Sequence, residues 1–252
     1  MWADPRAAAT ATGPATVAAL AARGDARLEA RPLAALVGTT VADLAVLASA
    51  WNDLPRDEYL RDGGRYRSRR HACFVQDRER GTLTRTPHRP HWQPTTYNAL
   101  HGGLERWFAP VEPAVADADA WRSLLSGCGA LFARVRAVPV WYIEAHQFRI
   151  DTEHGIGRPT PEGAHRDGVD LVAVFLVARE GVKGGETRVF QADGPAGQRF
   201  TLTEPWSLLL LDDERVIHET TPIQPLDGTR CGHRDTLVVT LRGGGFQGPG
   251  SV

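Results

Sequence analysis

The first half of the chain mixes stretches of helical hydrophobic patterning with irregular segments. Alanine, leucine and valine recur every three or four residues between 15 and 50, which predicts two helices punctuated by Gly24 and Gly38. Between 52 and about 102 this periodicity weakens and proline, glycine, arginine and aromatic residues accumulate, so loops and short strands are expected there. Residues 112–136 again carry apolar side chains at helical spacing. Helices are therefore available to pack on a sheet.

After Val138 the pattern changes to short apolar runs separated by turn residues. Runs such as VDLVAVFLVA, WSLLLLD and DTLVVTLR succeed one another up to residue 242 with no helical segment between them. This order indicates a sandwich or jelly roll rather than alternating strands and helices. We expect one structural domain overall, in which a helical and loop region at 1–137 packs on and covers a β core at 138–252.

The composition points away from nucleic acids and membranes as partners. The chain has 29 basic and 30 acidic residues and a formal net charge of -1, so it has no field that would attract a phosphate backbone. Its longest apolar run, Leu171 to Ala178, is only strand-sized, and no basic segment precedes an apolar one at the N-terminus. A cytoplasmic location is expected. The widely spaced Cys73, Cys128 and Cys231 indicate thiols rather than a disulfide framework or a zinc site.

Two histidines and one aspartate have the spacing of a metal site. His165 and Asp167 stand two residues apart just before a long apolar strand, and His218 lies within a later strand. Two imidazoles and one carboxylate occupy one face of an octahedral Fe(II) ion and leave the opposite face open, as in non-haem oxygenases. The open positions are where a co-substrate and O₂ bind. His165, Asp167 and His218 are therefore the candidate metal ligands and catalytic residues.

A second His-x-Asp triplet lacks the downstream histidine that the first one has. His233, Arg234 and Asp235 also open a strand, but no later histidine completes a triad. Arg234 instead suits the far carboxylate of a dicarboxylate co-substrate such as 2-oxoglutarate, because its planar fork forms a bidentate pair with a carboxylate. Arg230 and Arg242 are the alternatives for this role.

Several longer segments resemble a known family. HQFRI (146–150), GRPTPEGAHRDGVDLV (157–172), GGETRVF (184–190), LDDERVIHETTPI (211–223) and HRDTLVV (233–239), with upstream blocks between 61 and 117, carry the resemblance. Together they are similar to bacterial 2-oxoglutarate-dependent oxygenases of the L-isoleucine dioxygenase type, which hydroxylate free amino acids. The resemblance implies a mainly β fold with flanking helices and a double-stranded β-helix (jelly-roll, cupin-like) core.

The same resemblance implies Fe(II), 2-oxoglutarate and O₂ as cofactor and co-substrates. It assigns iron to His165, Asp167 and His218, and 2-oxoglutarate to Arg234. A small-molecule amino acid substrate needs partners for its carboxylate and ammonium groups, because an unpaired buried charge is costly. Six residues are candidates on strands and covering loops: Gln147, Arg149, Arg67, Tyr66, Trp92 and Tyr97.

Other interpretations stay open at this level. The same ligands suit Zn(II) or Mn(II) in a non-oxygenase metal-binding module. The iron chemistry also serves cyclisation or desaturation, and a carrier-tethered or peptidyl amino acid is a further substrate class. The sequence indicates no oligomeric state.

Overall fold

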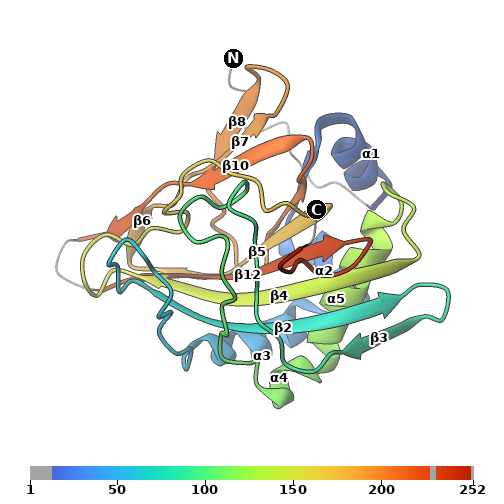
Figure 1. Ribbon diagram of the computed structural model, residues 1–252, viewed down its shortest axis with the longest axis horizontal. Helices are drawn as coiled ribbons and strands as arrows, with labels where there is room; N and C mark the ends of the chain where they lie inside the picture. Colours follow the sequence, from blue (N-terminus) through green and yellow to red (C-terminus); the bar gives the residue numbers. More distant parts are fainter. Residues whose placement is uncertain (1–12, 228–230, 251–252) are drawn as a thin grey trace.

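A computed structural model describes residues 13–227 and 231–250, which fold around one large antiparallel sheet (Figure 1). Its seven strands lie in the order β1-β9-β5-β12-β4-β2-β3. A three-stranded sheet, β10-β7-β8, and a two-stranded sheet, β11-β6, complete the strand arrangement. The expected mainly β fold with a jelly-roll, cupin-like core is confirmed.

The helices precede most of the strands in the chain. They are α1 (Gly13–Arg23), α2 (Ala30–Val37), α3 (Val41–Leu47), the short 3-10 helix η2 (Ala48–Trp51), α4 (Pro113–Ala116) and α5 (Asp119–Phe132). The strands are β1 (Asp25–Leu28), β2 (Arg67–Asp77), β3 (Thr82–Arg85), β4 (Val140–Asp151), β5 (Leu171–Glu180), β6 (Val182–Gly184), β7 (Thr187–Gln191), β8 (Gly197–Phe200), β9 (Leu208–Asp212), β10 (Val216–Thr220), β11 (Ile223–Pro225) and β12 (His233–Arg242).

Strand β2 is the main departure from the expected secondary structure. The sequence predicts only loops and short strands between 52 and 102, yet β2 is 11 residues long and pairs with β4 along its whole length. Alternate β2 residues Arg67, Arg69 and His71 are polar and lie buried inside the molecule. The apolar alternation that identifies a half-buried strand is therefore missing, although the backbone is fully paired.

Strand β1 is a second departure, since it interrupts a region expected to be helical. Gly24 has a positive φ of 78° and ends α1, so the chain turns directly into β1. β1 then pairs with β9 at the edge of the large sheet. Strands β1, β2 and β3 thus come from the N-terminal part of the chain and belong to the same sheet as the later strands.

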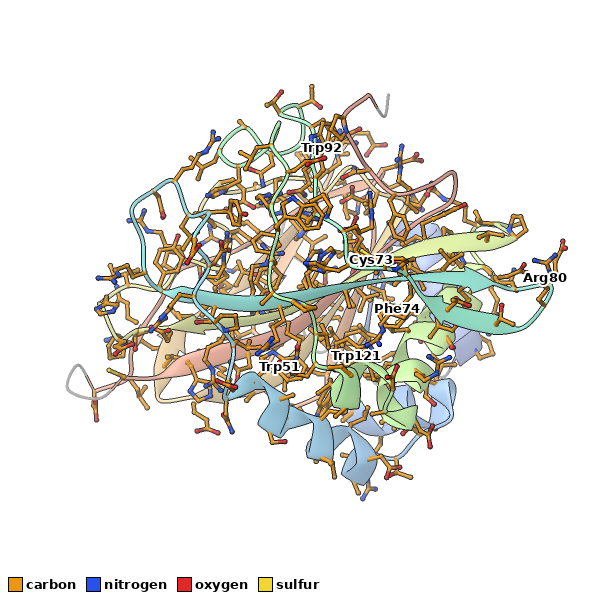
Figure 2. The ribbon with its side chains drawn as sticks, turned by 60° about the horizontal axis from the view of Figure 1, so that its bottom comes forward. Trp51, Cys73, Phe74, Arg80, Trp92 and Trp121 are labelled. Atoms are coloured by element: carbon orange, nitrogen blue, oxygen red, sulfur yellow. The ribbon has the colours of Figure 1, made fainter. Side chains whose placement is uncertain are left out.

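One face of the large sheet is covered by helices. Figure 2 shows Trp51, Phe74 and Trp121 on the side of β2 that faces the helices. These side chains are fully buried together with the helix-facing residues of β4, β5 and β12. The indole N–H of Trp51 donates to the carbonyl of Thr236 at 3.1 Å. This apolar layer makes the sheet a rigid support for the opposite face.

The opposite face of the sheet packs against the small sheet at one end and is open to a cavity at the other. Val172, Leu209 and Leu211 from the large sheet pack with Val189 and Val216 of the small sheet. Strands with apolar residues on both faces need cover on both sides, and the two sheets provide it. The cavity between the sheets is where the polar side chains of β2, β4 and β12 gather.

Two sequence-based expectations concern the membrane and the thiols. Among residues 13–227 and 231–250, no single helix has the length and apolar character needed to cross a membrane; Ala30–Val37 with Val41–Trp51 meets that test only as a pair bent by 96°. All three cysteines are free thiols; Cys73 and Cys128 are buried, and Cys231 is exposed.

Replacing Leu125 by alanine tests the helix layer. Leu125 of α5 is fully buried in the apolar layer, so Leu125→Ala is expected to lower the free energy of unfolding by about 3 kcal/mol. Urea unfolding followed by far-ultraviolet circular dichroism measures this change. Val46→Ala is the matched control, because Val46 is 75% exposed and its truncation should change the free energy of unfolding by less than about 0.5 kcal/mol. Equal effects of the two substitutions would contradict this packing.

Candidate metal and substrate site

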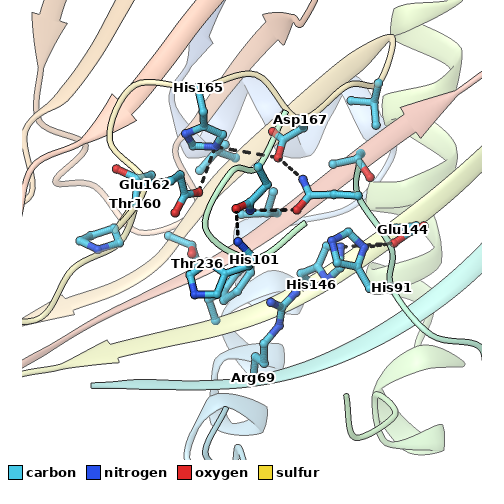
Figure 3. Close-up of a pocket in the computed structure, with 18 of the residues that line it drawn as sticks. Arg69, His91, His101, Glu144, His146, Thr160, Glu162, His165, Asp167 and Thr236 are labelled. Carbon is cyan, nitrogen blue, oxygen red and sulfur yellow. Dashed lines mark hydrogen bonds and ion pairs between the residues drawn. The ribbon is translucent and has the colours of Figure 1, made fainter. Parts of the chain in front are cut away.

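The polar cavity is bounded by the His-x-Asp loop, strand β10 and the inner face of the large sheet (Figure 3). On β4, alternation directs Glu144, His146 and Phe148 into the cavity and Ile143 and Ala145 toward the helices. The sequence pattern of β4 left this choice of face open. The helix layer decides it, because the apolar residues must face the helices.

The structure brings His165, Asp167 and His218 together at one end of this cavity. The His165 Nε2 atom lies 3.9 Å from Asp167 Oδ1, and His218 Nε2 lies 3.8 Å from Asp167 Oδ2. Backbone hydrogen bonds from His165 to His218 (3.0 Å) and back (2.9 Å) hold the loop against β10. The side-chain distances exceed hydrogen-bond lengths, while one donor atom of each residue lies within 4.8 Å of the other two. This arrangement suits a cation between them.

The protonation of the two imidazoles also suits a metal ion. His165 Nδ1–H donates to the carbonyl of Gly163 at 2.9 Å, so in the neutral ring Nε2 carries the free lone pair. Burial lowers the pKa of His165, but the Asp167 and Glu162 carboxylates outweigh burial and raise that pKa above its ordinary value. Burial holds the pKa of His218 well below its ordinary value, and its buried Nδ1 has no hydrogen-bond partner. A divalent cation at this position would accept the lone pairs of the two neutral imidazoles and balance the Asp167 carboxylate.

Asp213 organises the loop that carries Asp167. Its carboxylate accepts hydrogen bonds from the backbone N–H groups of Asp167 (3.0 Å), Gly168 (2.7 Å) and Val169 (3.1 Å). Gly168 has a φ of 75°, and a β-carbon there would lie 2.4 Å from the Tyr97 ring. Burial and the nearby Asp167 carboxylate raise the pKa of Asp213 to about 7. Asp213 lies in the turn after β9 and was not predicted from the sequence, because the segment 211–223 was used only for His218 and does not show that Asp213 contacts the His-x-Asp loop.

Asp213→Asn is expected to weaken metal binding about 10-fold to 100-fold, because the amide has only one acceptor oxygen for three backbone donors. Isothermal titration with Mn(II) measures the affinity without turnover. Asp193→Asn is the control, since Asp193 is exposed in the turn between β7 and β8. An unchanged affinity of the Asp213 variant would show that the loop holds its shape without these hydrogen bonds.

Arg234 lies in the wall of the same cavity. It is 4% exposed, and its guanidinium forms no hydrogen bond or ion pair with the described part of the chain. Burial, together with Arg179, lowers the pKa of Arg234 to about 10. A buried cation without a protein partner is costly, so this position calls for an anion. Of the two alternatives, Arg242 lines the cavity at the other end of β12, and Arg230 lies outside the described residues.

The other predicted substrate residues are placed differently. Arg67 lines the cavity. Gln147 and Arg149 lie on the opposite face of β4 from the cavity, as strand alternation requires for neighbours of His146 and Phe148. Arg149 forms an ion pair with Asp235 there at 2.7 Å. The expectation that these two residues bind substrate in this cavity is therefore corrected. Tyr66 also lies off the cavity and donates its hydroxyl to Asp62. Trp92 and Tyr97 line a separate depression on the outer side of the His-x-Asp loop.

A second cluster in the cavity wall was not predicted from the sequence. Glu144 accepts hydrogen bonds from His71 Nε2 (3.0 Å) and His91 Nδ1 (2.6 Å), and Arg69 donates to His146 Nδ1 at 2.7 Å. The three histidines and Glu144 also have the composition of a metal site. However, the His71 and His146 rings are stacked at 4.5 Å with 14° between their planes, so their in-plane lone pairs do not converge on one ion. The cluster is better described as a hydrogen-bonded wall around a buried carboxylate.

Comparison with known proteins identifies the family. The family described as 2OG-Fe dioxygenase matches residues 48–240. The chain belongs to this dioxygenase family. Its members use Fe(II), 2-oxoglutarate and O₂. The free Nε2 of His165, the Asp167 carboxylate between the two imidazoles and the unpartnered guanidinium of Arg234 fit these groups on chemical grounds.

Solved structures agree with the fold of this dioxygenase. A bsmA homolog from Methylobium petroleophilum PM1 is 53% identical, with 95% of this chain and 96% of that chain covered and a TM-score of 0.91. IDO from Bacillus thuringiensis is 15% identical over 92% and 96% of the two chains, with a TM-score of 0.75. The Fe(II)/(alpha)ketoglutarate-dependent dioxygenase TqaL is 20% identical over 90% and 85%, with a TM-score of 0.69. At these low identities the last two show the fold alone. A comparison with curated proteins finds no match.

Proposed function

We propose that this dioxygenase hydroxylates an unactivated C–H bond of a free L-amino acid or a small molecule derived from one, as the resemblance to the L-isoleucine dioxygenase type implies. The observation that carries the iron and 2-oxoglutarate roles is that two histidines and a carboxylate converge in the same cavity as Arg234, a buried cation with no partner among the described residues. A structural metal site would need no such cation.

Each group of the site has a proposed role. His165, Asp167 and His218 would hold the iron, and Arg234 would bind the far carboxylate of 2-oxoglutarate through its planar fork. When bound, iron and 2-oxoglutarate supply the activation of O₂ and the oxidation of a C–H bond, with succinate and CO₂ as co-products. The protein contributes the position of the substrate and the exclusion of water.

The cavity wall supports a small substrate over a peptidyl one. Arg67, Arg106 and His101 lie in this wall and are almost completely buried. A peptide or carrier-bound amino acid would have to keep its chain in solvent while its side chain reached the metal position. A free small molecule meets no such requirement. We therefore propose a small-molecule substrate for the cavity. We also propose that the protein has no nucleic acid or membrane partner and is cytoplasmic, on the balanced charge of its sequence.

Turnover with a panel of L-amino acids tests this function. The protein is incubated with Fe(II), 2-oxoglutarate, O₂ and each amino acid, and succinate and the amino acid products are measured by mass spectrometry. Hydroxylation adds one oxygen atom to one amino acid, whereas desaturation or ring closure removes two hydrogen atoms. Succinate formation that no amino acid stimulates would reject the proposed substrate class. Failure to form succinate at all would favour a metal-binding module without oxygenase activity.

A further inference from the structure

Two oppositely charged side chains in the cavity, Arg106 and Glu162, each have a buried polar atom without a hydrogen-bond partner among the described residues. We infer that Arg106 and Glu162 bind the zwitterionic head group of the substrate, with the Arg106 guanidinium on the α-carboxylate and the Glu162 carboxylate on the α-ammonium group. This inference rests on the proposed function for its substrate class. Neither residue was recognised as a substrate residue in the sequence, because the quoted segments that contain them do not show which side chains face the cavity.

Arg106 is a buried cation with no carboxylate partner. It is 2% exposed, and its only side-chain hydrogen bond among the described residues goes from Nη2 to Gln93 Oε1 at 2.8 Å. Its Nε is buried without any hydrogen-bond partner. Two backbone hydrogen bonds with His91 (2.9 and 3.0 Å) fix its position. Burial, together with Arg67, lowers the pKa of Arg106 to about 10, which still leaves it charged at neutral pH.

Two neighbouring arginines, Arg67 and Arg69, share the carboxylate of Asp57. Arg67 donates to Asp57 at 2.7 Å, and Arg69 lies 3.7 Å from the same oxygen and donates to His146. Asp57 is fully buried at its side chain, so it is not shared with solvent. One carboxylate thus serves two guanidinium groups, and the nearby Glu144 carboxylate is hydrogen-bonded by two histidines, so Arg106 has no ion-pair partner among the described residues. An anionic ligand would balance the charge of Arg106.

Glu162 is a partly buried carboxylate whose charge is opposite to that of Arg106. One oxygen, Oε2, is buried without a hydrogen-bond partner, and the other lies 3.5 Å from His165 Nε2. If His165 Nε2 binds a metal, it has no proton to donate, so Glu162 would lose its one neighbouring donor. Its side chain is 15% exposed and lines the cavity. A carboxylate in this position calls for a ligand with N–H donors and positive charge.

Arg106 and Glu162 face the same cavity and form no ion pair with each other. A free α-amino acid carries an ammonium group and a carboxylate on the same carbon atom, so one small ligand supplies a partner of opposite charge for each residue. Gln93 links this position to the proposed metal, because it accepts from Arg106 and donates from Nε2 to Asp167 Oδ1 at 3.3 Å. Figure 3 shows Glu162, His165 and Asp167 around this part of the cavity. The head group would therefore lie next to the metal-binding end.

Binding of matched ligands tests the two contacts separately. The anaerobic protein with Fe(II) and 2-oxoglutarate is titrated calorimetrically with the proteinogenic L-amino acids. The tightest binder is then compared with its amide, which lacks the carboxylate, and its 2-hydroxy acid, which lacks the ammonium group. Wild-type protein should bind the amino acid at least about 30-fold more tightly than either analogue, because each analogue leaves one buried charge unpaired.

Each variant should lose the preference for the amino acid over one of the two analogues. Arg106→Gln should weaken binding of the amino acid about 30-fold or more while leaving binding of the amide nearly unchanged. Glu162→Gln should weaken binding of the amino acid and leave binding of the 2-hydroxy acid nearly unchanged. Arg106→Lys, which keeps the charge, covers the case in which the glutamine variant does not fold. Arg31→Gln and Glu58→Gln are exposed controls that should bind all three ligands like wild type.

The visible absorption band of the iron complex with 2-oxoglutarate separates this inference from the proposed function. If the band forms but no amino acid binds, or both variants bind it with wild-type affinity, the head-group site is overturned while the oxygenase assignment stands. If no band forms but the two variants lose their separate preferences, the head-group site stands and the oxygenase assignment fails.

Discussion

Asp167→Ala is expected to lower kcat/KM for 2-oxoglutarate turnover by more than about 100-fold. Asp167 is the only carboxylate in the candidate triad, and its two oxygens face His165 and His218 at 3.9 and 3.8 Å. Loss of a group that merely orients a ligand typically costs about 10-fold to 100-fold, so loss of a ligand should cost more. Succinate formation measures turnover, and metal analysis of the purified protein measures bound iron.

Asp193→Ala is the control for this substitution, because Asp193 is an exposed aspartate in the turn between β7 and β8. It should keep wild-type turnover and iron content. Retained turnover in Asp167→Ala would contradict the triad directly. Loss of turnover with full iron content and an unchanged unfolding temperature would also count against Asp167 as a metal ligand, since the metal would then be held elsewhere.

Arg234→Lys is expected to weaken binding of 2-oxoglutarate about 10-fold to 100-fold while Fe(II) binding persists. Lysine keeps a cation but loses the planar fork that pairs with both oxygens of a carboxylate. A charge-assisted hydrogen bond contributes about 1.5–3 kcal/mol, which corresponds to this range of affinity. Arg234 has no side-chain partner among the described residues, so the substitution breaks no hydrogen bond or ion pair that holds this part of the fold. Calorimetric titration of the Fe(II) protein with 2-oxoglutarate measures the change.

Arg31→Lys is the matched control, because Arg31 is exposed on α2 and distant in sequence from every cavity residue. An unchanged affinity for 2-oxoglutarate in Arg234→Lys would show that another cation binds the far carboxylate. Arg242, which also lines the cavity, and Arg230 would then be tested in the same way.

The strands with long apolar runs could be predicted from the sequence. Strands β5, β9 and β12 combine long apolar runs with clear turn residues, and the structure has strands at all three places. Strand β2 could not be predicted as a long strand, because the face that would be apolar in an ordinary sheet carries Arg67, Arg69 and His71. Successive β2 side chains do point to opposite faces of the sheet, but both faces carry polar residues, so the sequence shows no apolar alternation.

The candidate metal residues could be selected from sequence because a metal site needs fixed residue types at a characteristic spacing. The substrate residues could not. The choice between Gln147 and His146, neighbours on β4, depends on which face the helices cover, and a single strand does not contain that information. Arg106 and Glu162 reach the same cavity through loops whose course the sequence does not determine. That each has a buried polar atom without a hydrogen-bond partner can be seen only in the structure.

Anaerobic titration of the purified protein with Fe(II) and then 2-oxoglutarate is the most direct test of the central claim, that one iron binds at His165, Asp167 and His218 and is chelated by 2-oxoglutarate. We expect a weak visible absorption band that saturates at one iron and one 2-oxoglutarate per chain and is absent in Asp167→Ala. A folded wild-type protein that binds iron and 2-oxoglutarate without forming this band, or an Asp167→Ala variant that forms it fully, would contradict the assignment.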